Sequence, residues 1–120
     1  MKISEAMTLI DEYTGTPIDE SMKYLWLQDL EDLIYKEIIL THEDPGSLPA
    51  AVNEGDRELL CEDPYSEVYI HYMNMQNDLL LRDTYSYANS SAAFYAVYGA
   101  YADYYNRTHQ PLSPAEVIKV

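Results

Sequence analysis

The sequence predicts an all-α fold: about four helices in a small bundle, with a long loop over about 42–56 and an extended C-terminal tail over 111–120. Two observations support this fold class. Apolar residues recur at spacings of three and four along four stretches, and helix-starting or turn-forming residues separate those stretches. Because 120 residues leave room for one modest core, we expect a single helical domain over 1–110 followed by the tail.

Two helices are expected in the N-terminal third, over residues 4–13 and about 17–39. Gly15 and Pro17 separate them, because glycine is common just past a helix end and proline suits a first helical position. Thr16 is the expected N-cap of the second helix, since its side-chain oxygen can accept a backbone N–H. The wide apolar face of this helix consists of Met22, Trp26, Leu27, Leu30, Leu33, Ile34 and Ile38.

The expected loop over about 42–56 is longer than most connections in a small domain. Its turn-forming residues are Pro45, Gly46, Pro49 and Gly55. The pattern on either side is ambiguous. The run 37–41 is strand-like in composition, although the continuous periodicity favours helix, and residues 57–61 fit either a helical turn or a short strand.

Two further helices are expected in the C-terminal half. The third spans about 64–82, with Asp63 as a good cap and Pro64 as a good first residue. The fourth spans about 84–107, with its start at either 84 or 88. Its aromatic stripe is Tyr87, Phe94, Tyr98, Tyr101 and Tyr105, and a second stripe of small residues is Ala92, Ala96 and Gly99. Small residues let a neighbouring backbone approach, so we expect the second stripe to mark a tight helix contact.

Tyrosine is strongly enriched: the chain has 13 tyrosines, and ten of them lie between Tyr65 and Tyr105. A tyrosine ring buries like other large apolar groups, whereas its hydroxyl needs water or a partner. We therefore expect the main aromatic stripe to be core, with hydroxyls at its rim. Ten rings exceed what a four-helix core can hide, so the surplus predicts a protein-interaction surface. The candidate residues for that surface are Tyr69, Tyr85, Tyr95 and Tyr104.

The charge is the second unusual feature, with 21 acidic against seven basic residues and a net charge of −14. Such a field repels phosphate backbones, so we expect no sequence-specific nucleic-acid binding. An acidic surface can line a passage through which DNA slides, can imitate DNA, or can simply maintain solubility. The sequence shows no secretory signal and no apolar run near the roughly 20 residues of a spanning helix, so we expect no membrane association and an intracellular protein.

No motif for catalysis or metal binding is apparent. His42, His71 and His109 are widely separated, and no Glu-x-x-His pair occurs, so we expect no metal site. Cys61 is the single cysteine, and its acidic neighbours should raise the thiol pKa, which argues against a nucleophile and favours a small, partly buried apolar residue. The four glycines are isolated and form no phosphate-binding loop. We therefore expect no enzymatic activity and no cofactor.

The C-terminal half resembles a known group of proteins. The run Asp63-Pro64-Tyr65 precedes Val68-Tyr69-Ile70-His71-Tyr72 and Gln76-Asn77-Asp78; Tyr87-Ala88-Asn89-Ser90-Ser91-Ala92-Ala93-Phe94 precedes Tyr98, Tyr101-Ala102 and Tyr104-Tyr105-Asn106-Arg107. This pattern resembles small helical head–tail connector and adaptor-type proteins of tailed phages and prophages. The likeness covers residues 17–111 in layout and 63–111 in motif, and it consists of packing and surface residues.

The resemblance implies a non-enzymatic structural protein, an adaptor or head-completion component at the portal vertex. Its implied partners are the portal and tail-side phage proteins, together with further copies of itself in a ring. Its implied locations are the host cytoplasm during assembly and the head–tail junction of the virion. An alternative from the charge alone is an acidic DNA mimic, or another protein-binding inhibitor, that occupies a host DNA-binding protein.

Overall fold

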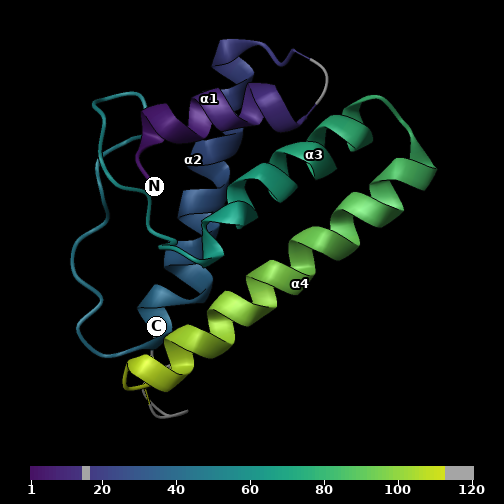
Figure 1. Ribbon diagram of the computed structural model, residues 1–120. Helices are drawn as coiled ribbons and strands as arrows, with labels where there is room; N and C mark the ends of the chain where they lie inside the picture. Colours follow the sequence, from purple (N-terminus) through teal and green to yellow (C-terminus); the bar gives the residue numbers. More distant parts are fainter. Residues whose placement is uncertain (15–16, 113–120) are drawn as a thin grey trace.

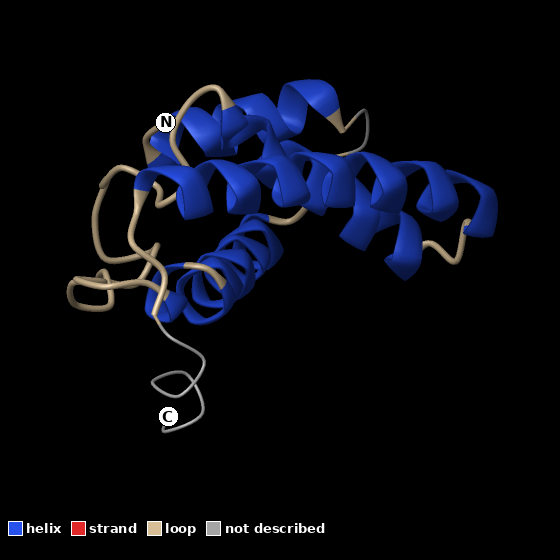
Figure 2. Ribbon diagram, turned by 90° about the horizontal axis from the view of Figure 1, so that it is seen from below, coloured by secondary structure: helices blue, strands red, loops and turns tan. Residues whose placement is uncertain are grey.

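The computed structural model describes residues 1–14 and 17–112 and is built from helices (Figures 1 and 2). The elements are α1 (Ile3–Tyr13), α2 (Glu20–Glu37), η1 (Ile39–Thr41), η2 (Tyr65–Glu67), α3 (Val68–Leu80) and α4 (Thr84–Thr108), where η1 and η2 are single 3₁₀ turns. The only β-type pairings in the described part are two isolated bridges. The predicted all-α fold of four helices is therefore confirmed.

Helices α3 and α4 form an antiparallel hairpin, and this pair makes the most extensive helix contact (Figure 1). Helices α1 and α2 both pack against α3, so α3 is enclosed on several sides. The long α4 leans on α3 along one side and leaves its other side uncovered. The described C-terminal end lies beside the end of α2, because Pro111 forms a bridge with His42.

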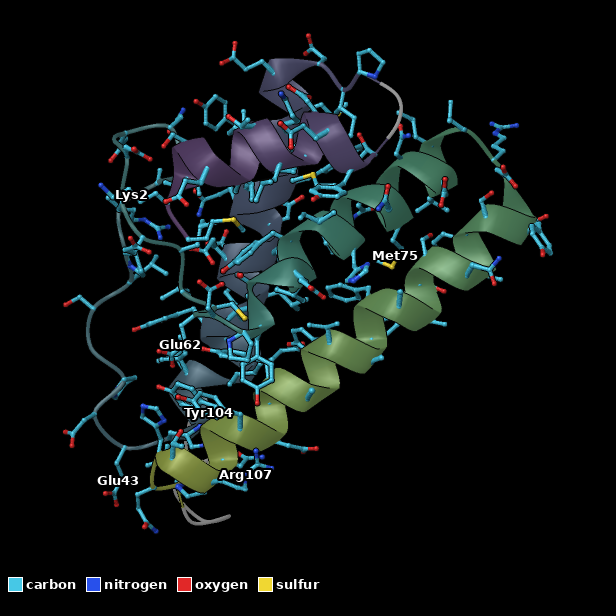
Figure 3. The ribbon with its side chains drawn as sticks, in the orientation of Figure 1. Lys2, Glu43, Glu62, Met75, Tyr104 and Arg107 are labelled. Carbon is cyan, nitrogen blue, oxygen red and sulfur yellow. The ribbon has the colours of Figure 1, made fainter. Side chains whose placement is uncertain are left out.

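The core draws on all four helices and on the connection between α2 and α3. Its buried residues are Ile3, Ala6, Ile10, Trp26, Leu27, Leu30, Ile34, Ile38, Ile39, Val52, Leu59, Cys61, Val68, Tyr69, Tyr72, Met73, Met75, Phe94, Tyr101 and Tyr105. The predicted aromatic stripe of α4 is confirmed as core at Phe94, Tyr101 and Tyr105, whereas Tyr87 and Tyr98 pack partly buried against it. Met75 of α3 points toward α4 (Figure 3).

Two helix starts differ from the sequence-based expectation. Helix α2 begins at Glu20 rather than near residue 17, and the expected cap Thr16 lies outside the described residues. Helix α3 begins at Val68 rather than near residue 64, since the η2 turn comes first, and the Asp63–Pro64 peptide bond before that turn is cis. The Asp63 carboxylate is engaged by the Ser66 hydroxyl and does not cap α3.

The ambiguous run 37–41 is helical, since α2 passes into η1. Residues 57–61 contain no helical turn; an isolated bridge pairs Glu58 with Lys2, and the amide of Leu59 donates to the carbonyl of Met1 at 2.9 Å. This pairing fixes the connection beside the start of α1.

The connection from α2 to α3 is irregular but anchored. The Tyr35 hydroxyl donates to the carbonyl of Gly46 at 2.6 Å, and the Val52 amide donates to the Gln28 side-chain carbonyl at 2.9 Å. At the C-terminal end, the Leu112 amide donates to the carbonyl of Thr41 at 2.9 Å. The first two residues of the predicted tail are thus paired with the chain, and residues 113–120 lie outside the described part.

A buried carboxylate, Glu31 of α2, connects three parts of the fold. Glu31 is only 2% exposed, and its Oε1 accepts from Arg57 Nη1 at 2.7 Å and from the Leu60 amide at 3.1 Å. Its Oε2 accepts from the Tyr69 hydroxyl at 2.7 Å, and that hydroxyl in turn accepts from the Cys61 amide at 2.8 Å. Since an unpaired buried charge is costly, these donors are required for Glu31 to lie inside the protein.

Removing this carboxylate tests how much it contributes to the stability of the fold. Glu31→Ala leaves Arg57, the Tyr69 hydroxyl and the Leu60 amide without their acceptor, so we expect a loss of about 3–5 kcal/mol in the free energy of unfolding. Urea denaturation followed by circular dichroism measures it. Asp29→Ala, an exposed carboxylate on the same helix, serves as the control and should change stability by less than about 0.5 kcal/mol. Equal effects of the two substitutions would refute the assigned role.

Candidate protein-interaction surface

The uncovered side of α4 is uncharged over residues 84–102, in a strongly acidic protein, and the exposed Asp103 and Arg107 follow on the same side. Residues 84–102 contain no charged side chain, whereas the chain as a whole carries −14. We define the outer face of α4 as the exposed residues between positions 85 and 102, which are Tyr85, Ala88, Asn89, Ala92, Tyr95, Ala96, Gly99 and Ala100. They recur at spacings of three and four, opposite the buried Phe94 and Tyr101, so the stripe follows directly from the way α4 packs on the core.

The small residues of α4 do not form the internal helix contact that the sequence suggested. Ala92, Ala96 and Gly99 are exposed, and a Cβ placed on Gly99 would meet no atom within 4 Å. Helical glycine costs roughly 1 kcal/mol relative to alanine, so Gly99 weakens α4 without improving packing inside this chain. The expectation of a tight intramolecular contact at this stripe is therefore wrong.

The four tyrosines predicted to form an interaction surface divide into three groups. Tyr85 and Tyr95 lie on the outer face of α4, where they are 80% and 62% exposed. Tyr104 is half-buried beside Glu62 (Figure 3), to which its hydroxyl donates at 3.2 Å, and its ring centroid lies 5.1 Å from that of Tyr65. Tyr69 is completely buried. The structure thus brings only Tyr85 and Tyr95 onto one face.

The assignment of Tyr69 to the surface is wrong. Tyr69 lies on α3, which other helices enclose, and its hydroxyl is fully used between the Glu31 carboxylate and the Cys61 amide. The four-residue spacing from Tyr69 to the buried Met73 is a signal in the sequence that could have placed it in the core. The spacing does not stand out, because α3 is buried around more of its circumference than a surface helix.

Tyr95 is held in place rather than loosely exposed. Its ring lies edge-on against Phe94, with ring centroids 5.0 Å apart and an interplanar angle of 69°. Phe94 in turn contacts Tyr72 and Tyr98, at centroid distances of 5.2 and 5.4 Å. A ring supported in this way loses little freedom when a partner covers it, which favours its use in binding.

Hydroxyls of the aromatic cluster reach acidic groups at its rim. The Tyr98 hydroxyl donates to Glu37 at 2.6 Å, which resembles the pairing of Tyr104 with Glu62. Burial raises the pKa of Tyr98, and its hydrogen bond to the Glu37 carboxylate raises the pKa further. Burial likewise raises the pKa of Tyr101 and, together with Glu31, that of Tyr69. These hydroxyls therefore stay protonated in the folded protein.

The single thiol is inert in this environment. Cys61 is fully buried, and burial raises its pKa well above the usual range, with the charges of Glu31 and Glu62 acting in the same direction. The expected direction is confirmed, although burial rather than the acidic neighbours is the largest cause. The thiol donates to the carbonyl of Tyr65 at 3.3 Å.

Two of the three histidines lie near one another, since the ring centroids of His42 and His109 are 6.5 Å apart, whereas His71 lies on α3. His42 is buried, where its Nδ1 donates to the Ile38 carbonyl at 2.6 Å and its Nε2 lies 2.7 Å from the Asn106 side-chain oxygen. This residue joins the end of α2 to α4, a role that nothing in its sequence neighbourhood indicated. His71 Nε2 lies 3.9 Å from a Glu67 oxygen. Over residues 1–14 and 17–112, no group of three or more possible ligands could hold a metal ion.

Comparisons with protein-family models, curated proteins and solved structures find no match to this chain. Among the described helices, none has both the length and the apolar character needed to cross a bilayer.

The Tyr69 hydroxyl is buried and hydrogen-bonded, whereas Tyr95 is exposed. Removing each hydroxyl in turn tests this contrast. Tyr69→Phe deprives Glu31 of a donor and the Cys61 amide of its acceptor, so we expect a loss of about 1–3 kcal/mol in unfolding free energy. Tyr95→Phe is the matched control and should be neutral within about 0.5 kcal/mol, since its hydroxyl is at the surface. Chemical denaturation of both variants measures the difference, and a neutral Tyr69→Phe would contradict the buried network.

The raised tyrosine pKa values predict a loss of stability in alkali. Tyr69, Tyr98 and Tyr101 have folded-state pKa values above those of the unfolded chain, so their contribution to stability is complete below about pH 10 and declines as pH rises further. Tyrosinate absorbance should therefore show one fraction that ionises only as the protein unfolds. The same titration in denaturant is the control and should show a single class near pH 10. A single class in the native protein would contradict the burial of these hydroxyls.

Proposed function

We propose that this chain is a non-enzymatic assembly protein of a tailed phage or prophage: a head–tail connector, of adaptor or head-completion type, that binds at the portal vertex. Its action is geometric, because helix faces dock against partner proteins without a chemical step. The resemblance of residues 63–111 to head–tail connector proteins supports the class. The outer face of α4 supports the mode of action.

The observation that carries the proposal is the combination of small residues and supported tyrosine on that face. Ala92, Ala96 and Gly99 allow a partner backbone to approach closely, and the projecting Tyr95 ring supplies apolar area with a hydroxyl for hydrogen bonding. Centres of protein interfaces are poor in charge and rich in aromatic residues, and the face has both properties. Gly99 makes no close packing contact within the chain, which also fits a role in contact with a partner.

The acidic remainder of the surface fits a position at the portal vertex. With 21 acidic residues against seven basic ones, the surface repels DNA, so a channel lined by it would let DNA pass without holding it. The proposed partners for the outer face of α4 are the portal and tail-side proteins of the same phage.

The experiment is to mix the chain with the portal protein from the same source and examine the product by native mass spectrometry and negative-stain imaging. The expected result is decoration of one end of the portal. Tyr95→Ala should weaken binding by roughly tenfold or more, as truncation of a central aromatic contact does. Leu25→Ala, which trims an exposed apolar residue on α2, is the control and should bind normally.

A second variant separates docking from stability. Gly99→Leu places a good helix former in open space, so the free chain should become more stable by up to about 1 kcal/mol while its bulk blocks close approach of the partner. The expected outcome is higher thermal stability together with weaker portal binding. A wild-type chain that ignores the portal, or a Gly99→Leu variant that binds it normally, would contradict the proposal.

A further inference from the structure

Tyr65 of η2 and Tyr104 of α4 form a close pair of phenol rings at the rim of the core. Their ring centroids lie 5.1 Å apart with an interplanar angle of 34°, and both side chains are half-buried. Tyr65 precedes the α3–α4 hairpin, whereas Tyr104 lies near the C-terminal end of α4. The fold therefore brings two oxidisable rings from distant parts of the chain into contact at a position that solvent reaches.

This pair differs from the other tyrosine contacts in its exposure. Every other contact between two tyrosine rings in the described part of the chain includes Tyr101, which is only 2% exposed. Tyr95 is exposed, but the ring that it contacts is Phe94, which has no hydroxyl and cannot form a phenoxyl radical. A small oxidant in solution can therefore reach both rings of a touching tyrosine pair at Tyr65 and Tyr104.

A carboxylate is positioned to take the proton of one phenol. The Tyr104 hydroxyl donates to Glu62 Oε1 at 3.2 Å, and Glu62 is exposed (Figure 3). This hydrogen bond raises the pKa of Tyr104, so the phenol is protonated at neutral pH and must lose a proton when it loses an electron. A base within hydrogen-bond reach assists that loss, because it accepts the proton directly.

We propose that Tyr65 and Tyr104 are a site of oxidative cross-linking, at which a one-electron oxidant converts the pair into dityrosine. Each phenol gives one electron to the oxidant and its proton to a base, which is Glu62 for Tyr104 and water for Tyr65. The two phenoxyl radicals join through the ring carbons next to their oxygens. The hydrogens on those two carbons then move to the oxygens and restore two phenols. The net change is one new carbon–carbon bond and the loss of two electrons and two protons.

The product ties η2 covalently to the C-terminal end of α4. It closes a loop over residues 65–104, so the unfolded chain has less conformational freedom and the folded state is favoured. The linked chain should therefore unfold at a higher urea concentration than the unmodified chain. Neither ring belongs to the outer face of α4, so this inference does not depend on the proposed function.

Photo-oxidation of the full chain with ruthenium tris-bipyridine and persulfate, a small one-electron oxidant, tests the proposal. The reaction is run at low protein concentration, the monomer is isolated by size exclusion, and its dityrosine fluorescence is measured. Trypsin should then release residues 58–82 joined to residues 83–107, since it cleaves after Arg57, Arg82 and Arg107. Fragmentation of this product by mass spectrometry should place the link at Tyr65 and Tyr104.

Single substitutions identify the reacting rings. Tyr65→Phe and Tyr104→Phe should each abolish the linked product, because a phenylalanine ring forms no phenoxyl radical. Tyr98→Phe is the matched control, since the Tyr98 hydroxyl also donates to a carboxylate whereas the ring that it contacts is Phe94. This variant should give as much linked product as the wild type. Circular dichroism verifies that each variant is folded.

Glu62→Gln separates proton acceptance from ring contact. It keeps a side-chain oxygen for the hydrogen bond but removes the basic carboxylate, so dityrosine should form more slowly at the same two residues. Formation at the wild-type rate would refute the role of Glu62. A monomer without dityrosine, a link that involves Tyr101, or coupling only between copies through Tyr95 would overturn the proposed site.

Discussion

The buried charge of Glu31 is the constraint on which the rest of the structure depends. A carboxylate at 2% exposure is tolerated only if donors surround it, and here they come from the α2–α3 connection and from α3 itself. The requirement fixes residues 57–61 against α2 and orients Tyr69 inward. The same segment pairs with the start of α1. Glu31 of α2 is therefore connected directly to residues 57–61 and to α3, and through residues 57–61 to α1.

Because α3 is enclosed by the other helices, only one side of α4 packs against the core. Phe94 and Tyr101 fill that side, while Tyr98 and Tyr104 lie at the rim with their hydroxyls on acidic side chains. The tyrosines thus add apolar area to the core of a small acidic protein, and the hydroxyls of Tyr69, Tyr98 and Tyr104 are paired with carboxylates. Over residues 84–102 the opposite side of α4 is left uncharged, and the Tyr95 ring there lies edge-on against Phe94.

The sequence predicted the four helices, the buried stripe of α4 and the inert thiol, because periodic apolar residues and local composition determine these features. It could not predict the Glu31 network, whose members are separated by up to 38 residues. The burial of Tyr69 does not follow from the sequence for the same reason, since it depends on which helices surround α3. Helix α3 begins later than the sequence indicates because the η2 turn precedes it. The offset of Tyr95 and Tyr104 from the main stripe predicts that both lie at the surface; Tyr95 does, whereas Tyr104 is half-buried.

The central claim is that the outer face of α4 is a docking surface held by a rigid core. Hydroxyl-radical footprinting of tyrosine side chains, on the free chain and on the chain bound to portal protein, tests it most directly. The account predicts that Tyr85 and Tyr95 are oxidised in the free chain and protected in the complex, while Tyr69 and Tyr101 are protected in both states. Equal oxidation of Tyr95 in the free and bound chain would contradict it.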